Sequence, residues 1–158
     1  MPTKKQRLKE LKTDWAFAEI VISYNTVIVN KTIITSAEDA YKVIQSLWNK
    51  DLINLQEQFM AYYLNRANQL IGYRLLTTGS MHSTSVDIRL LVSLALHCMA
   101  SNVIIAHNHP SNNLQASKAD EQITLQTRDA LKLIDVKLLD HLIISENGYL
   151  SLREEGAI

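Results

Sequence analysis

The sequence predicts an α/β domain in which a mixed central β-sheet is flanked by helices. Short segments rich in β-branched and aromatic residues, which favour strands, alternate with segments whose apolar residues recur at helical spacing. Some of the expected strands are joined by tight turns and others are separated by a helix, so the sheet should not be simply parallel. The 158 residues, 47% of them hydrophobic, are enough for one compact unit with a sizeable core.

The first third of the chain should contain a polar start, two strands and a helix. Residues 1–13 are polar and basic, and segments 15–24 and 27–34 have the composition of strands. Ser36 can cap a helix that runs to about Trp48, because acidic residues follow it and apolar residues then recur at helical spacing.

The middle of the chain is expected to form a hairpin and a second helix. Segments 55–64 and 69–77 are strand candidates joined by a turn at 65–68. The helix after Asp87 should present one apolar stripe, which comprises Ile88, Leu91, Val92, Ala95, Leu96 and Met99.

The last third begins with segment 103–106, whose four apolar residues suit the middle of a sheet. A helix should run from Ser117 to about Ile134, followed by a strand over 136–145. Asn147-Gly148 predicts a tight turn that leads to a short strand at 149–152.

The charge pattern and the single cysteine limit the function classes. The formal net charge is zero, but residues 1–12 hold five basic residues against one acidic residue. This basic start could contact nucleic acid or simply be solvated. Because Cys98 is the only cysteine, the chain can form neither an internal disulfide nor a cysteine-based zinc site. Cys98 itself should be a buried small apolar residue. Neither a membrane span nor a secretory signal is evident, so a cytoplasmic protein without membrane contact is expected.

His107, His109 and Asp120 are the candidate metal ligands. Two residues at positions i and i+2 of an extended chain face the same way, so the two imidazoles can converge on one ion. A loop and one helical turn can bring the carboxylate of Asp120 back to them. Three such ligands with one position left for water is the arrangement of catalytic zinc. Asp120 also fits a structural alternative, since an acid three residues after Ser117 is typical of a capped helix start.

The order of these residues resembles the JAMM motif of MPN-type zinc hydrolases. His107-x-His109, seven residues and Ser117-x-x-Asp120 have its spacing, and the RadC family is closer still. The further matching segments are His107-Asn108-His109-Pro110-Ser111, Leu139-Asp140-His141-Leu142-Ile143-Ile144 and Ser151-Leu152-Arg153-Glu154-Glu155-Gly156. The resemblance covers residues 36–158, leaves 1–35 as an N-terminal extension, and implies the cytidine deaminase-like JAMM/MPN fold.

The resemblance also implies roles for the residues. His107, His109 and Asp120 would bind one Zn²⁺ per chain. Glu57, at the start of a strand, would accept a proton from the zinc-bound water and pass it to the leaving nitrogen. Ser117 would hydrogen-bond the developing oxyanion as well as cap its helix.

The chain departs from the RadC pattern in three places. Asn112 stands where relatives usually have Gly, and segment 86–91 keeps only the Arg of the family's His-Pro-Arg-Glu-Val-Phe. The helix-hairpin-helix region of longer relatives is absent from this sequence. His141 is expected to form a structural hydrogen-bonded pair with Asp140 rather than to bind metal. His82 lies in a loop near no motif.

Three functions are therefore open. The first is a zinc-dependent hydrolase that cleaves a peptide or isopeptide bond in a peptide or protein substrate. The second is a nucleic-acid-associated accessory protein of DNA repair or of a mobile element, as the customary label of the RadC family suggests. The third is a metal-binding module without turnover, for instance a homo-oligomer or a partner-docking domain. Retention of Glu57 favours the first.

Overall fold

The fold is built on one five-stranded mixed sheet, described here from a computed structural model that covers residues 32–79 and 86–158. The strands are β1 (Gln58–Leu64), β2 (Leu70–Thr78), β3 (Asn102–Asn108), β4 (Lys137–Ser145) and β5 (Gly148–Ser151). Their order across the sheet is β2-β1-β3-β4-β5. Only β3 and β4 are parallel neighbours, so the predicted mixed α/β sheet is confirmed.

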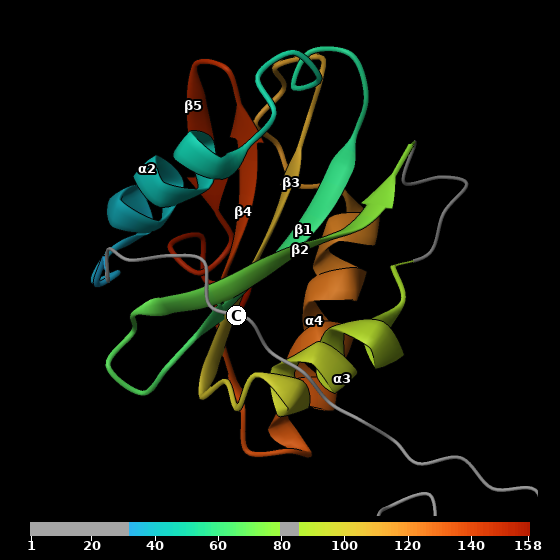
Figure 1. The fold of residues 1–158 in the computed structure, drawn as a ribbon. Coiled ribbons are helices and arrows are strands. Elements are labelled where there is room, and N and C mark those ends of the chain that lie inside the picture. Colours follow the sequence, from blue (N-terminus) through green and yellow to red (C-terminus); the bar gives the residue numbers. More distant parts are fainter. Residues whose placement is uncertain (1–31, 80–85) are drawn as a thin grey trace, which may run out of the picture.

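Three helices cover the two faces of this sheet (Figure 1). Helix α2 (Ala37–Leu47) lies on one face, and α3 (Ile88–His97) and α4 (Lys118–Lys132) lie on the other. Each begins where the sequence indicates, because Ser36, Asp87 and Ser117 accept hydrogen bonds from backbone N–H groups of the first turn. None of the helices in these residue ranges is long and apolar enough to cross a membrane.

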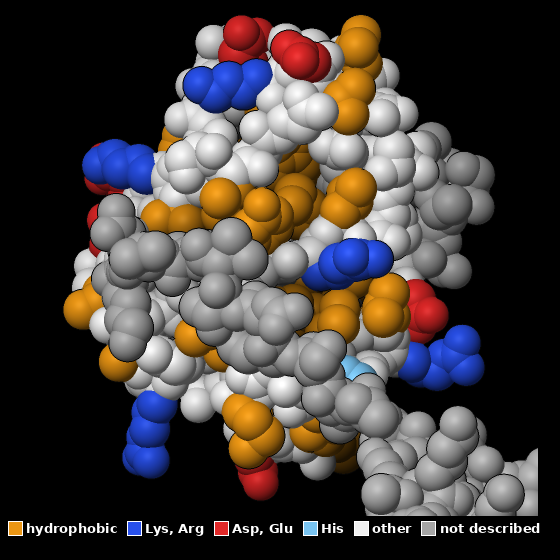
Figure 2. Space-filling model, viewed as in Figure 1, with side chains coloured by type: hydrophobic (Ala, Val, Ile, Leu, Met, Phe, Trp, Pro, Cys, Tyr) orange, Lys and Arg blue, Asp and Glu red, His pale blue; other side chains and the backbone are white. Residues whose placement is uncertain are grey.

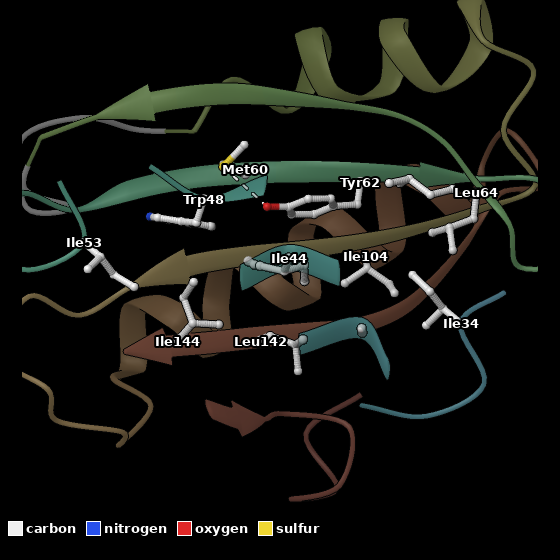
Figure 3. Close-up of a cluster of buried hydrophobic side chains, with 13 residues drawn as sticks. Ile34, Ile44, Trp48, Ile53, Met60, Tyr62, Leu64, Ile104, Leu142 and Ile144 are labelled. Carbon is white, nitrogen blue, oxygen red and sulfur yellow. Dashed lines mark hydrogen bonds between the residues drawn. The ribbon is translucent and has the colours of Figure 1, made fainter. Parts of the chain in front are cut away.

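The core has two layers, one on each face of the sheet. Side chains alternate along each strand, so Tyr62 and Ile104 pack toward α2, whereas Ala61 and Ile105 pack toward α3 and α4. Figure 3 shows the first layer, in which residues of β1, β3 and β4 surround Ile44 of α2. All seven residues of β1 are buried, as expected for a strand covered on both faces.

The layer beneath α2 reaches only one end of the edge strand β2, at Leu70. Tyr73 and Leu75 of β2 remain 44% and 40% exposed, although Tyr73 stacks on Tyr62 of β1. Figure 2 shows hydrophobic side chains gathered on this face of the molecule between α2 and β2. This face is opposite to the one on which the candidate site lies.

Three features differ from the sequence-based expectations. The strand predicted from Leu55 begins at Gln58, because residues 50–55 form turns. In the predicted apolar stripe of α3, Leu96 and Met99 are 50% and 82% exposed, and Met99 lies beyond the helix with a positive φ of 54°. The turn before β5 occupies Glu146-Asn147, and Gly148 already pairs with Ser145.

The remaining expectations have mixed outcomes. The strand predicted at 15–24, most of the one at 27–34 and His82 lie outside the described residues. Ile33 forms one isolated bridge with Gln69. Cys98 is half-buried against the core layer of α3 and α4, close to the buried apolar role expected of it.

Candidate metal centre

His107, His109 and Asp120 meet at the C-terminal end of β3, on the face covered by α4. The Nε2 atoms of the two histidines are 3.0 Å apart. Asp120 Oδ1 lies 3.1 Å from His107 Nε2, and Asp120 Oδ2 lies 3.9 Å from His109 Nε2. The structure therefore brings the three predicted residues together as a group that could hold a metal ion.

The two histidines converge because the chain stays extended past the end of β3. His107 lies within the strand, and the backbone N–H of His109 donates to the carbonyl of Ile144 on β4 at 3.0 Å. The turn that follows is closed by a bond from Asn112 N–H to the carbonyl of His109. Asn112 has a positive φ of 59°, a conformation that asparagine tolerates and that the glycine expected from the RadC pattern also adopts readily.

Asp120 is delivered by the first turn of α4. The Ser117 hydroxyl accepts a hydrogen bond from Asp120 N–H at 3.2 Å, and Asp120 Oδ2 accepts one from Ser117 N–H at 2.7 Å. This reciprocal capping box confirms the structural role considered for Asp120. It does not exclude the metal role, because the other carboxylate oxygen faces His107.

The Asp120 carboxylate is held in its charged form. Burial alone would raise its pKa, but in the metal-free protein the hydrogen bond and charge of a protonated His107 ring, together with the hydrogen bonds from Ser117, hold the pKa below its usual range. Its side chain is only 2% exposed. A buried carboxylate that remains ionised at neutral pH is a suitable ligand for a cation.

Hydrogen bonds on the outer side of the rings orient both imidazoles. His109 Nδ1 lies 2.5 Å from the carbonyl oxygen of Asn113, so it carries the proton and donates it. His107 Nδ1 lies 2.8 Å from His141 Nε2, and His141 Nδ1 lies 2.6 Å from Thr124 Oγ1. The Thr124 hydroxyl donates its proton to the carbonyl of Asp120 at 2.5 Å.

The direction of this chain follows from counting protons. Thr124 has used its one proton, so it accepts from His141 Nδ1–H. His141 Nε2 is then a lone pair that accepts from His107 Nδ1–H. Burial is the main cause that holds the pKa of His141 well below 6.5, in agreement with a neutral ring. When the rings of His107 and His109 are neutral, their Nε2 atoms are therefore left as lone pairs on the side of Asp120, which is the state in which they can bind a metal ion.

Two lone pairs and a carboxylate at such short separations suit a bound cation. Without one, the facing nitrogen atoms 3.0 Å apart repel each other unless one is protonated. Two nitrogen ligands of tetrahedral zinc stand about 3.3 Å apart when each bond is about 2.05 Å. The residues present therefore fit a metal ion of the kind that imidazole and carboxylate bind.

The contacts of His141 were predicted only in part. The expected hydrogen bond with Asp140 forms through the backbone, where Asp140 Oδ1 accepts from His141 N–H at 2.7 Å, but the two side chains do not meet, since adjacent residues of β4 point to opposite faces. Asp140 accepts bonds from Ser151 Oγ and from backbone N–H groups, while His141 reaches His107. The signal in the sequence was a histidine directly before the apolar run Leu142-Ile143-Ile144, at a position that is fully buried in the structure.

Ser117 adjoins the group, whereas Glu57 lies one residue before β1, the strand next to β3. Phe59 pairs with His107 in the ladder between β1 and β3, and extending that antiparallel register by two residues on each chain relates Glu57 to His109. Glu57 is half-buried, and its backbone carbonyl accepts a hydrogen bond from Gly79 N–H at 2.8 Å. Ser117 is adjacent through the capping box with Asp120.

Comparison with known proteins shows a consistent set of relatives. A UPF0758 protein of Flavobacterium johnsoniae is 41% identical over 123 residues, which are 78% of this chain and 52% of the relative. The UPF0758 protein YfjY of Escherichia coli is 44% identical over 65% of this chain and 64% of its own length. The UPF0758 protein SSU98_1084 of Streptococcus suis is 33% identical over 87% of this chain and 54% of its own length.

The chain thus spans between 52% and 64% of the length of these three relatives. The family described as RadC-like JAB domain matches residues 34–157, which include all the strands and helices described above. Together with the mixed sheet and the His107, His109 and Asp120 group, this match shows that the chain belongs to the RadC family.

Proposed function

We propose that this chain is a zinc-dependent hydrolase that cleaves an amide bond of a peptide or protein with a metal-activated water. The observation that supports the proposal most is the convergence of His107, His109 and Asp120, with the Nδ1 atoms of both histidines hydrogen-bonded on the outer side, so that Nε2 of each neutral ring is free to bind a metal ion. Three ligands leave one position of a tetrahedral ion open for water, which is the catalytic rather than the structural arrangement.

The bound metal would supply a water molecule with a lowered pKa and polarise the carbonyl of the substrate. His107, His109 and Asp120 would hold the ion between β3 and α4. Glu57 would take the proton of the attacking water and deliver it to the leaving nitrogen. The hydroxyl of Ser117 uses its oxygen to accept from Asp120 N–H, which leaves its proton available to a developing oxyanion.

One experiment separates binding from turnover. Zinc content is measured by atomic emission, and hydrolysis is followed on a fluorogenic peptide library that includes isopeptide-linked lysine peptides. The wild type should bind one Zn²⁺ per chain and hydrolyse part of the library. His109→Ala should lose the metal, because one of three ligands is removed. Glu57→Gln should keep the metal and lose hydrolysis, because the base is absent while the ligands remain.

His97→Ala is the matched control, since His97 is exposed on α3 and is not one of the three ligands. Wild-type zinc binding no tighter than that of His109→Ala would refute the metal centre. Unchanged hydrolysis by Glu57→Gln would remove Glu57 from the mechanism. Zinc binding without hydrolysis of any peptide in the library would favour a metal-binding module without turnover.

A further inference from the structure

Asn108 lies between the two metal-binding histidines but points away from them. It is the last residue of β3 and is fully buried. Alternation along the extended chain places its side chain on the face opposite to that of His107. A fully buried amide must satisfy its hydrogen bonds within the protein, so its partners show what it is for.

All three hydrogen bonds of the Asn108 amide go to the segment 53–58. Its Nδ2 donates to the carbonyl oxygens of Ile53 at 2.7 Å and Gln56 at 2.9 Å. Its Oδ1 accepts from the N–H of Gln58 at 2.7 Å. The Gln56 carbonyl and the Gln58 N–H belong to the two peptide groups that adjoin Glu57. One side chain therefore binds the backbone on both sides of the proposed base.

These hydrogen bonds to both sides of Glu57 are important because Glu57 lies outside the regular secondary structure. It stands one residue before β1, and the residues before it form turns. Those turns are closed by local bonds, in which the N–H groups of Leu55 and Gln56 donate to the carbonyl of Leu52. Asn108 joins this local structure to β3, the strand that carries His107.

We propose that Asn108 is a positioning residue that sets the place of Glu57 relative to the His107, His109 and Asp120 group. The proposal rests on the proposed function, in which Glu57 is the base. The link is short, because Gln58 N–H donates directly to Asn108, and Glu57 and His109 are the chain neighbours of these two residues. Only an amide of this size offers two donors and one acceptor together, so aspartate cannot replace it.

The test needs no substrate and uses the full chain loaded with Co²⁺ in place of zinc. The visible absorption of the bound Co²⁺ is followed against pH, and its midpoint reports deprotonation of the bound water. A nearby carboxylate disfavours hydroxide, so Glu57→Gln should lower the midpoint by about half a pH unit or more. Asn108→Ala and Asn108→Leu, which add no charge, should retain one metal ion and lower the midpoint in the same direction.

The double variant Asn108→Ala with Glu57→Gln decides between positioning and general disturbance. Its midpoint should equal that of Glu57→Gln alone, since Asn108 acts only through Glu57. Asn102→Ala is the matched control, because Asn102 lies at the other end of β3 and also makes two hydrogen bonds through its Nδ2. Its midpoint should be that of the wild type. Asn108→Leu keeps a similar side-chain shape without adding a charge, and serves if the alanine variant does not fold.

The outcomes distinguish failure of this inference from failure of the proposed function. A wild type that binds no Co²⁺, or a midpoint that Glu57→Gln does not move, would refute the proposed function. A midpoint that shifts in Glu57→Gln but not in the folded Asn108 variants would overturn the positioning role. Loss of the metal in every folded Asn108 variant would also overturn it, because Asn108 would then support the ligands themselves.

Discussion

Asp120 serves the fold and the site through different oxygen atoms. Its Oδ2 accepts the N–H of Ser117 and so closes the capping box of α4, whereas its Oδ1 lies 3.1 Å from His107 Nε2. A helix cap and a metal ligand are therefore not competing explanations of this residue. The cap fixes the carboxylate before any ion binds, which reduces the conformational entropy that binding would otherwise cost.

The hydrogen bond between Thr124 and His141 should contribute to metal affinity. Thr124→Val keeps the side-chain shape but removes the acceptor of His141 Nδ1–H, so the proton direction along His141 and His107 is no longer fixed. Loss of such an outer partner typically lowers metal affinity by 10–100-fold, and we expect about a tenfold loss of Zn²⁺ affinity in competition with a chelating dye.

Thr127→Val is the matched control for this substitution. Thr127 lies one turn further along α4, is equally buried, and its hydroxyl has no hydrogen-bond partner among the described residues. Its replacement should leave zinc affinity unchanged and stability equal or slightly higher, because a buried unpaired hydroxyl is removed. Equal affinity of the Thr124 and Thr127 variants would exclude a role of the Thr124 hydroxyl in binding.

At this scale the ligands could be predicted from sequence and their hydrogen-bond partners could not. Spacing alone places His107 and His109 on one side of an extended chain. The contact between His107 and His141 depends instead on the register of β3 and β4, where Ile105 pairs with His141. Nothing in the local sequence of either strand determines that register.

At the scale of elements, the site depends on the first turn of α4. Ser117→Ala removes the acceptor of Asp120 N–H and should lower the free energy of unfolding by about 1 kcal/mol, measured by urea denaturation. Ser36→Ala is a matched control, because Ser36 caps α2 in the same way by accepting from Asp39 N–H. Both variants should lose similar stability, but only Ser117→Ala should also lose amide hydrolysis. Equal hydrolysis in the two variants would restrict Ser117 to its capping role.

The first residues of the helices could be predicted closely from their capping residues. The first residue of β1 could not, because it depends on a contact with a residue far away in the sequence. Ser36, Asp87 and Ser117 each begin a helix at the expected position, because a side chain close in sequence satisfies the first N–H groups. The segment from Leu55 onward has the composition of a strand, yet β1 begins only at Gln58, after a run of turns. Its surroundings are fixed by Asn108, about fifty residues away, which binds the carbonyls of Ile53 and Gln56.

At the scale of the molecule, the candidate site is a polar cluster built into one of two apolar layers. Phe59 stacks on His107 and meets the edge of His141, so both imidazoles pack as aromatic core residues. His107 and His141 are fully buried, whereas the His109 side chain is 15% exposed. The cluster is thus closed toward the sheet, and solvent reaches it from the side of His109.

A fully buried neutral histidine should make the stability of the metal-free protein depend on pH. The folded pKa of His141 lies well below 6.5, mainly because of burial and next because of the charge of His107. Below about pH 6.5 the unfolded chain therefore binds a proton that the folded protein does not. Above about pH 6.5 His141 is neutral in both the folded and the unfolded chain, so it causes no pH dependence there. Below about pH 6.5 the free energy of unfolding should fall by up to about 1.4 kcal/mol for each pH unit of acidification. Urea denaturation in the presence of a chelator measures this slope. His141→Gln should reduce the slope, while His97→Gln, on the exposed side of α3, should not. A wild-type slope equal to that of His141→Gln would show that His141 does not control acid stability.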